Sequence, residues 1–140
     1  MIIGIGVDVV DLARFERAAT RTPGVLARLF TDAELWDGER ERSMRSMAAR
    51  FAAKEALIKA IGDSTGVRWH DLTVVSNGLR NPSLTVHNAL AEIVSAHGIK
   101  AIHLSMSHDA GVAIAYVIVE GAETPLSPGP PVSSDEKSPA

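Results

Sequence analysis

The stretch Met47-Ala-Ala-Arg-Phe-Ala-Ala-Lys-Glu-Ala-Leu-Ile-Lys-Ala-Ile61 decides how this chain folds, because it predicts one long helix for the rest to pack against. It is rich in Ala, Leu, Lys, Arg, Glu and Met, which all favour helices, and no Pro or Gly interrupts it. Gly62 follows directly, where a left-handed residue commonly ends a helix. Met47, Phe51 and Ile58 repeat at helical spacing, so they mark the side of the helix that we expect to be buried.

One charged residue interrupts this apolar stripe. Glu55 lies one turn after Phe51, and a carboxylate on the buried side of a helix costs free energy unless it is paired or binds a cation. A simple interpretation is an i,i+4 surface pair with Lys59, worth about 0.3–0.5 kcal/mol. The alternative is a functional carboxylate, and the choice depends on what the rest of the chain supplies.

Composition narrows the class of protein. A chain of 140 residues with 46% hydrophobic and 22% charged residues is long enough and apolar enough for one globular domain with a core. The absence of cysteine excludes disulfides, thiolate nucleophiles and cysteine-ligated metals, and it fits a reducing compartment, so we predict a cytoplasmic location. We see no signal peptide and no apolar run of membrane-spanning length. A net charge of −3 argues against a nucleic-acid partner.

The first ten residues predict a buried strand with two unlike faces. Residues 2–10 are mostly apolar and β-branched, and alternation puts Gly4, Gly6 and Asp8 on the face opposite an apolar row of Ile3, Ile5, Val7 and Val9. Glycines within a strand mark the close approach of another backbone, side chain or ligand. Aspartate is uncommon in strands, so Asp8 needs an explanation.

A helix predicted from Leu12 to about Thr20 follows this strand and carries local positive charge. Asp11 is the better candidate for its N-cap, which leaves Asp8 without a capping role and makes it a functional candidate. Around Glu16, the segment from residue 14 to residue 28 contains four arginines: Arg14, Arg17, Arg21 and Arg28. One interpretation is a solvated basic face, and the other is a docking surface for an acidic partner.

The remaining pattern alternates short strands and helices, so we predict an α+β fold with a small, antiparallel-rich sheet packed on the long central helix. The expected elements are a short helix opened by a capping box over 31–34, an exposed charged segment over 37–45, hairpin strands over 72–76 and 84–86 joined by Asn77-Gly78, a helix over 88–97, a strand over 102–107, a turn over 108–111 and a strand over 112–119.

The end of the chain divides into two parts by composition. Residues 112–119 are wholly apolar, which predicts a strand buried on both faces and therefore central or at a subunit interface. From residue 121 onward proline and serine dominate, which predicts a disordered tail. We therefore expect one domain over 1–120 and a tail over 121–140.

Asp8 and Glu55 are two carboxylates that strand and core preferences leave unexplained. Two carboxylates that converge need a cation or a proton between them. Magnesium is typically held by one or two carboxylates together with phosphate oxygens and water. Lys59 lies one turn beyond Glu55, where it would reach the same phosphates, and Arg50 is a further cationic candidate. His108, predicted to lie in a turn after a strand, is a candidate substrate contact.

Several common motifs are absent. Gly4-Ile-Gly6 lacks the third glycine of a dinucleotide-binding fingerprint, and the chain has no Gly-x4-Gly-Lys-Ser/Thr phosphate loop. None of the five histidines has metal-ligand spacing. The Ser105–Asp109 segment contains triad residue types, but no nucleophile elbow surrounds them, so we exclude a serine hydrolase.

Three motifs together resemble the holo-[acyl-carrier-protein] synthases, which are the small, single-domain 4′-phosphopantetheinyl transferases. They are Gly4-Ile-Gly-Val-Asp8, Arg50-Phe-Ala-Ala-Lys-Glu-Ala56 with Lys59, and Ser105-Met-Ser-His108. The motifs occur in the family's order and the resemblance runs from residue 2 to about residue 120, with Arg14 and Leu29-Phe-Thr-Asp-Ala-Glu-Leu35 also fitting. The hairpin loop departs slightly, since three residues separate Gly78 from Pro82.

This resemblance implies a reaction and a set of roles. Phosphopantetheine would pass from coenzyme A to a serine of apo acyl carrier protein, releasing adenosine 3′,5′-bisphosphate, in fatty acid or polyketide biosynthesis. Asp8 and Glu55 would be the magnesium ligands and Lys59 the phosphate-binding lysine, and these three would form the catalytic set. Arg50 and His108 would line the coenzyme A site. The general base stays open between a metal-bound water and Glu55.

The resemblance also implies the partners. Family members are α+β trimers with active sites between protomers, so we expect a homotrimer. Acyl carrier proteins are acidic, so the candidate partner-binding residues are Arg14, Arg21 and Arg28. Two alternatives remain: a non-catalytic module that docks acidic helical proteins, for which Asp8 and Glu55 are dispensable, and a magnesium-dependent phosphohydrolase, which releases phosphate without a protein acceptor.

Overall fold

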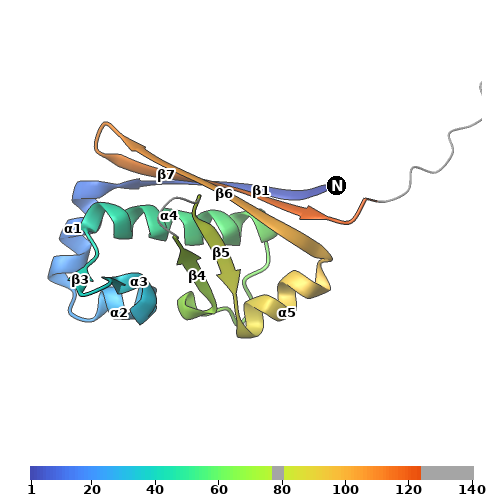
Figure 1. The fold of residues 1–140 in the computed structure, drawn as a ribbon, viewed down its shortest axis with the longest axis horizontal. Helices are drawn as coiled ribbons and strands as arrows, with labels where there is room; N and C mark the ends of the chain where they lie inside the picture. The colour runs from blue at the N-terminus through green and yellow to red at the C-terminus, as the bar shows by residue number, and fades with distance from the viewer. Residues whose placement is uncertain (77–80, 124–140) are drawn as a thin grey trace, which may run out of the picture.

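A three-stranded antiparallel sheet packed against one long helix forms the frame of the molecule (Figure 1). In the computed structural model the strand order is β1 (Ile2–Asp11), β7 (Val112–Gly121), β6 (Ile99–Asp109), and α4 (Met44–Ile61) lies across one face of this sheet. The predicted α+β fold, with a small antiparallel sheet and a long central helix, is confirmed.

The structure describes residues 1–76 and 81–123. The predicted Asn77-Gly78 turn and nearly all of the predicted tail lie outside these residues. The smaller elements lie mostly on the side of α4 away from the three-stranded sheet (Figure 1). They are α1 (Leu12–Arg21), α2 (Val25–Leu29), α3 (Asp32–Leu35), the hairpin of β2 (Trp36–Asp37) and β3 (Arg40–Glu41), the 3₁₀ turn η1 (Trp69–Asp71), the hairpin of β4 (Leu72–Val75) and β5 (Ser83–Val86), and α5 (Asn88–Ala96).

Helix α4 begins three residues earlier than its composition predicts. The Ser43 side chain accepts a hydrogen bond from the Ser46 backbone N–H at 3.2 Å, which caps the helix before Met44. Gly62 ends it in the left-handed region with φ 79°, as predicted. Half of the helix is buried, including every alanine except the half-buried Ala49, so small side chains let the sheet approach closely.

The glycines of β1 bring its backbone into contact with α4. A Cβ atom at Gly4 would collide with the carbonyl oxygen of Ala60, and one at Gly6 with the carbonyl oxygen of Ala56. The close approach predicted for this strand face is therefore made by the helix backbone. Since β1 and α4 run in opposite senses here, Asp8 comes to lie beside the part of α4 that precedes Ala56.

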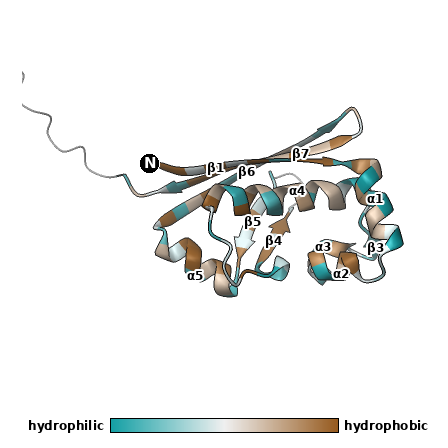
Figure 2. Cartoon of the chain, turned by 180° about the vertical axis from the view of Figure 1, so that it is seen from behind, coloured by the Kyte–Doolittle hydropathy of each residue, from teal (hydrophilic) through white to brown (hydrophobic). Residues whose placement is uncertain are grey.

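The other face of β1 corrects the prediction of a buried strand. β1 is an edge strand, and its apolar row is exposed in the single chain: Ile3, Ile5, Val7 and Val9. β7 is the central strand, as predicted, but only its Ala113, Ala115, Val117 and Val119 face is fully buried. Its alternate residues extend the apolar row of β1, and Figure 2 shows hydrophobic colour along these strands. We use the name outer sheet face for the surface formed by Ile3, Ile5, Val7, Val9, Ile114, Tyr116 and Ile118.

Strand β6 is longer than predicted and includes His108. His108 is paired with Ala113 on β7, so it lies within the ladder and not in a turn, which corrects that prediction. The turn itself is formed by Ala110 and Gly111, both with positive φ (50° and 77°). The Gly111 carbonyl accepts a hydrogen bond from the Leu12 backbone N–H at 3.0 Å, which ties the hairpin tip to the start of α1.

Elsewhere the predicted helix caps agree with the structure, and the prediction differs from the structure over the charged segment at residues 37–45. Asp11 caps α1 by accepting a hydrogen bond from the Arg14 backbone N–H at 2.8 Å. The Thr31–Glu34 capping box opens α3 as predicted. Residues 36–41 form the β2–β3 hairpin, whereas the sequence predicts only an exposed charged segment over residues 37–45. No helix among the described residues is long and apolar enough to cross a membrane.

Candidate active site

The two predicted carboxylates face one hollow at the β1 edge of the sheet. This hollow of about 520 Å³ is lined by Asp8, Glu55, Arg14, Phe15 and Phe51, among others. Asp8 comes from β1 and Glu55 from α4, so the contact between the glycine face of β1 and α4 sets their relative position. Only 8% of Asp8 is exposed, so its charge is largely withdrawn from water.

The electrostatics of Glu55 show that the carboxylates lie close together. Burial raises the pKa of Glu55, and the neighbouring charge of Asp8 raises it further. Two adjacent carboxylates with hard oxygen donors suit Mg²⁺, which completes its octahedral coordination with water and phosphate oxygens. No group of three or more potential metal ligands occurs among residues 1–76 and 81–123, so this pair is the extent of the protein donor set described. The residues fit a magnesium ion whose remaining ligands come from substrate and solvent.

Lys59 is bound to Asp8 and not to Glu55. Its Nζ donates to Asp8 Oδ1 at 2.9 Å and to the Val7 carbonyl oxygen at 3.2 Å. The hydrogen bond to Asp8 and its negative charge raise the pKa of Lys59. The simple interpretation of an i,i+4 surface pair with Glu55 therefore does not describe the structure. The Lys59 side chain is 54% exposed, so it has room to turn toward an incoming phosphate.

A second hollow surrounds Arg50 and His108 at the β6 edge. Its volume is about 310 Å³, and Ser43, Ser46 and Pro82 also line it. Arg50 is only 4% exposed, and burial together with the charge of Arg42 lowers its pKa to about 10. Its Nη1 donates to the Ser46 hydroxyl, while its Nε is buried without a partner among residues 1–76 and 81–123. A buried guanidinium with an unpaired N–H is a site suited to an anion.

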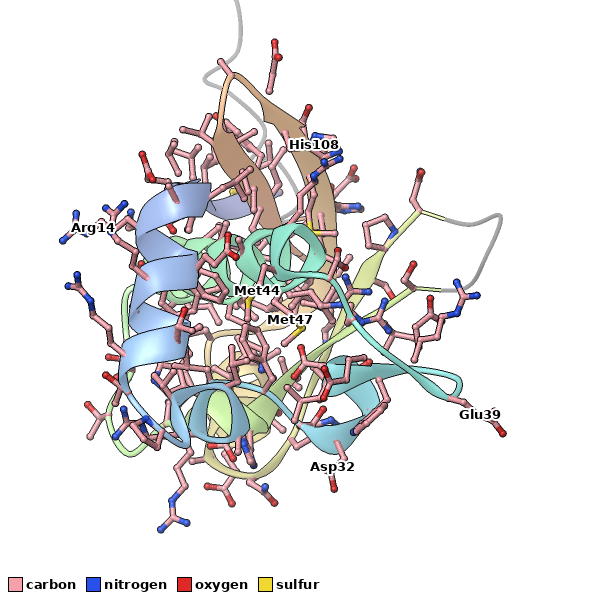
Figure 3. The ribbon with its side chains drawn as sticks, turned by 90° about the vertical axis from the view of Figure 1, so that its left-hand side faces the viewer. Arg14, Asp32, Glu39, Met44, Met47 and His108 are labelled. Carbon is pink, nitrogen blue, oxygen red and sulfur yellow. The ribbon has the colours of Figure 1, made fainter. Side chains whose placement is uncertain are left out.

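The two hollows share no lining residue. Asp8 and Glu55 lie at the β1 edge and His108 at the β6 edge, with β7 between them. Figure 3 shows the labelled Arg14 and His108 on different sides of α4. One chain therefore joins Asp8, Glu55 and Lys59 in one place and Arg50 with His108 in another.

The predicted docking arginines are all exposed, but they are spread out. Arg14 on α1 lines the carboxylate hollow and points away from the body of the molecule (Figure 3). Arg21 ends α1, and Arg28 on α2 lines a separate hollow with Arg68 and His70. Only Arg14 lies directly at the carboxylates.

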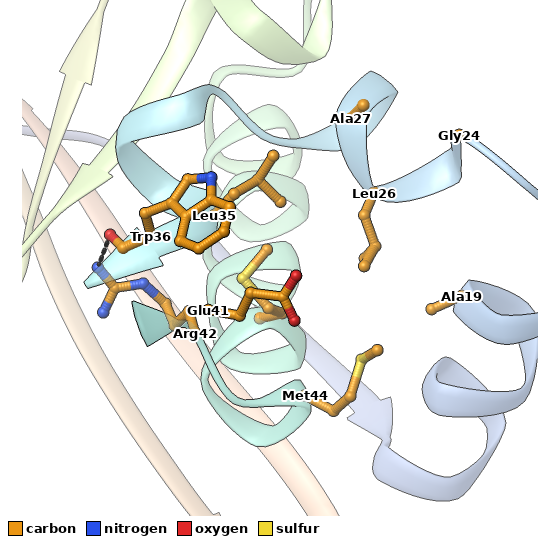
Figure 4. Close-up of a pocket in the computed structure, with 10 residues that line it drawn as sticks. Ala19, Gly24, Leu26, Ala27, Leu35, Trp36, Glu41, Arg42 and Met44 are labelled. Carbon is orange, nitrogen blue, oxygen red and sulfur yellow. Dashed lines mark hydrogen bonds between the residues drawn. The ribbon is translucent and has the colours of Figure 1, made fainter. Parts of the chain in front are cut away.

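A further hollow of about 340 Å³ lies between α1, α2 and the β2–β3 hairpin (Figure 4). Leu26, Leu35, Trp36 and Met44 line it, and Arg42 forms part of its wall by donating to the Trp36 carbonyl oxygen at 3.1 Å. It contains none of the predicted site residues.

Sequence reasoning missed two features beside the carboxylate hollow. Phe15, Phe51 and Trp69 form an aromatic row, with ring centroids 5.8 Å apart for Phe15–Phe51 and 5.4 Å apart for Phe51–Trp69. Lys54 and Glu34 form a fully buried ion pair, with Nζ 2.6 Å from Oε1. Lys54 and Glu34 lie 20 positions apart, and no local pattern in the sequence predicts a contact over that separation.

Comparison with known proteins gives a consistent result. The family model of the 4′-phosphopantetheinyl transferase superfamily matches residues 4–117. The holo-[acyl-carrier-protein] synthase of Leifsonia xyli subsp. xyli is 58% identical over 120 residues, which cover 86% of this chain and 98% of that protein. The holo-[acyl-carrier-protein] synthase of Renibacterium salmoninarum is 49% identical over 120 residues, covering 86% of this chain and 99% of that protein.

Solved structures agree with these relatives. The crystal structure of the Neisseria meningitidis holo-[acyl-carrier-protein] synthase matches with a TM-score of 0.76 and 31% identity, covering 86% of this chain and 99% of that one. The Helicobacter pylori holo-[acyl-carrier-protein] synthase, solved in complex with coenzyme A, matches with a TM-score of 0.69 and 30% identity, covering 83% of this chain and 99% of that one. The chain belongs to the 4′-phosphopantetheinyl transferase superfamily and is an enzyme of its holo-[acyl-carrier-protein] synthase group.

Proposed function

We propose that the protein transfers the 4′-phosphopantetheine group of coenzyme A to a serine of apo acyl carrier protein and releases adenosine 3′,5′-bisphosphate. Support comes from the relatives named above and from one structural observation: the convergence of Asp8 and Glu55 at a hollow that Arg14 also lines. The nucleophile is the serine of the carrier protein. The lining of the hollow agrees with this, because it consists of carboxylates, an arginine and apolar side chains. The reaction serves fatty acid or polyketide biosynthesis in the cytoplasm.

Asp8 and Glu55 hold a magnesium ion in this proposal. Such an ion offsets the negative charge of the pyrophosphate as the phosphoanhydride breaks. Lys59 moves from Asp8 to the phosphates and supplies a further positive charge close to the leaving group. Its exposed side chain and its present bond to the same carboxylate support this role.

Arg50 and His108 hold the phosphate-bearing nucleotide part of coenzyme A. The unpaired Nε of Arg50 supports this assignment, because an anion bound there would satisfy a buried donor that has no partner in the part of the chain that the structure describes. His108 lines the same hollow from β6.

The separation of the two hollows supports a homotrimer. A neighbouring copy that brings its β6 edge to this copy's β1 edge places Arg50 and His108 opposite Asp8 and Glu55. Such a contact joins unlike surfaces, and it closes into a ring when the rotation between copies allows. The exposed outer sheet face supplies apolar surface that association would bury. Residues 1–120 form this catalytic unit, with the Pro/Ser-rich segment outside it.

The acidic carrier protein docks on α1 and α2 through Arg14, Arg21 and Arg28. The net charge of −3 repels an acidic partner at long range, so a local basic surface is required for productive encounter. Arg14 lies closest to the reacting groups because it lines the hollow that holds both carboxylates.

The decisive experiment is to incubate the protein with coenzyme A, magnesium and apo acyl carrier protein and to measure the mass of the acceptor. A gain of one phosphopantetheine group on the carrier supports the proposal. Phosphate release without modification of the carrier would point to a phosphohydrolase, and carrier binding without any reaction would point to a docking module.

A further inference from the structure

Lys54 occupies a fully buried position in which its whole hydrogen-bonding capacity is used. Its Nζ donates to Glu34 Oε1 at 2.6 Å, to the Leu29 carbonyl oxygen at 2.8 Å and to the Trp69 carbonyl oxygen at 3.1 Å. An ammonium group has three donors, so none is left for water or substrate. The side chain is 0% exposed, and its charge lies 5.1 Å from the centre of the Phe30 ring.

Glu34 completes this junction from the other side. Its Oε1 accepts from the Thr31 backbone N–H at 3.0 Å, and its Oε2 accepts from the Val74 backbone N–H at 3.1 Å. Its own carbonyl oxygen accepts from Arg42 Nε at 2.7 Å. The pair therefore connects α4 to the end of α2, to α3, to β4 and to the segment between β3 and α4.

The segments held by this junction are those that border the carboxylate hollow and the docking arginines. Lys54 directly precedes Glu55 on α4, and Leu29 directly follows Arg28 on α2. Trp69 packs on Phe51, which lines the carboxylate hollow. A buried side chain with three fixed acceptors therefore holds the end of α2 and the start of η1 at a set position along α4.

We propose that Lys54 is a positioning residue that sets the carrier-docking segment around Arg28 in register with Glu55. This inference rests on the proposed function, because it assigns Arg28 to carrier docking and Glu55 to the reacting site. Lys54 touches neither substrate and acts through the Leu29 and Trp69 carbonyls. Glu34 is its buried counter-ion.

The test compares Lys54→Met with the double variant Lys54→Met/Glu34→Gln. Glu34 lies close enough to Arg50 to affect its pKa, and removing both charges together keeps the net charge beside Arg50 unchanged. The double variant also leaves no unpaired buried charge, so it folds even where Lys54→Met does not. Val119→Ala, which opens the buried face of β7 far from the junction, is the control for a general loss of stability.

All variants are measured well below their melting temperatures, with KM and kcat determined for each substrate. We expect both junction variants to lower kcat/KM for the carrier by about tenfold or more, because a misplacement of about 1 Å can cost up to about 100-fold. We expect their KM for coenzyme A to stay within about threefold of wild type, because the contact of β1 with α4, and not the junction, sets the position of Glu55. At an equal loss of Tm, we expect Val119→Ala to change neither kcat/KM for the carrier nor KM for coenzyme A.

Two results would overturn the inference: equal effects on carrier and coenzyme A, or carrier kinetics in Val119→Ala that fall as far as in the junction variants. Calorimetric titration of the carrier into each protein separates this inference from the proposed function. A wild-type chain that binds carrier without modifying it refutes the proposed function. The carrier affinities of the junction variants then still decide whether Lys54 positions the docking segment.

Discussion

Asp8 and Glu55 should be indispensable for catalysis and dispensable for folding. We expect Asp8→Asn and Glu55→Gln each to lower turnover roughly 100-fold or more, because each removes a charged oxygen ligand that Mg²⁺ requires. Each variant keeps the shape of its side chain, so the far-ultraviolet circular dichroism spectrum stays that of the wild type. The matched control is Asp32→Asn, an exposed acid on α3. Near wild-type turnover of either site variant at limiting magnesium would remove the metal-site assignment.

Glu55 should lower the stability of the protein when no cation is present. Because its folded-state pKa lies above the usual 4.5, the folded chain binds more protons than the unfolded chain between these two values. The protonated Glu55 side chain contributes fully to stability below the pKa that it has in the unfolded chain. This contribution is lost as the pH rises through the pKa that it has in the folded chain. We therefore expect Glu55→Gln to raise Tm in EDTA at pH 7.5 by about 1–3 °C, with the difference disappearing near pH 4.

This measurement has a simple control in Glu92→Gln, since Glu92 is exposed on α5. A lower Tm for Glu55→Gln at pH 7.5 would mean that the carboxylate makes a favourable contact in the folded state. Residues at functional sites often lower the stability of the folded protein. The Tm of Glu55→Gln relative to wild type measures this effect at Glu55.

At the scale of elements, the contact between β1 and α4 leaves no room for a side chain at Gly6. We expect Gly6→Ala to lower the free energy of unfolding by about 1–3 kcal/mol or to prevent folding, because the added methyl group meets the Ala56 carbonyl oxygen, which cannot move without bending α4. Chemical denaturation measures the loss. Ile2→Ala, which shortens an exposed side chain of the same strand outside the outer sheet face, should change stability by far less. Equal effects of the two changes would contradict the described packing.

Helix α1 should act on the carrier and not on coenzyme A. We expect Arg14→Glu to raise KM for the carrier about tenfold at low salt and to leave KM for coenzyme A nearly unchanged. The effect should shrink as salt rises, because exposed charges are screened beyond roughly 8–10 Å at physiological ionic strength. Arg17→Glu, on the same helix, is the matched control. A loss confined to kcat at saturating carrier would assign Arg14 to positioning, and unchanged kinetics would leave it a solvated charge.

Local patterns predicted the elements well where the signal lay within a few residues. The caps at Asp11, Gly62 and Thr31–Glu34 were confirmed because a cap depends on neighbours in sequence. The close approach predicted for the glycine face of β1 was also confirmed, and the group that approaches is the backbone of α4. The β2–β3 hairpin was missed because its charged residues carry no alternating pattern.

Contacts between distant residues were harder to predict. The adjacency of Asp8 and Glu55 was anticipated because both residues conflict with their local environment, and such conflicts point to function. The Lys54–Glu34 pair shows the opposite case, because a lysine and a glutamate in helices are ordinary residues until folding buries them together. The exposure of the outer sheet face was not foreseen, since an apolar strand reads the same whether its own chain or another copy covers it.

At the scale of the whole molecule, two inactive variants should restore each other if the site lies between protomers. Asp8→Asn leaves the Arg50 hollow intact, and Arg50→Ala leaves the carboxylate hollow intact. In randomly mixed rings of the two, about a quarter of the sites join one intact half from each variant. We expect each variant alone to be nearly inactive and the co-refolded mixture to recover transfer activity.

The control mixes Asp8→Asn with Glu55→Gln, which damage the same half of the site and cannot complement. No recovery with Arg50→Ala would place the whole site within one chain, and recovery in the control mixture would mean that Asp8 and Glu55 act from different chains. Size-exclusion chromatography with light scattering on the same samples reports the number of chains directly.

The ion pair between Lys59 and Asp8 also bears on the order in which ligands arrive. In the free protein an ammonium group already neutralises this carboxylate, so under the proposed roles a metal ion would compete with Lys59 and would bind weakly. The phosphates of coenzyme A offer that ammonium group a different partner and thereby free Asp8. Under the proposed roles, each ligand strengthens the binding of the other, and linkage requires the same factor in both directions. On this proposal Lys59 would occupy the place of the metal ion in the free enzyme, so the enzyme would bind divalent metals poorly until coenzyme A is present.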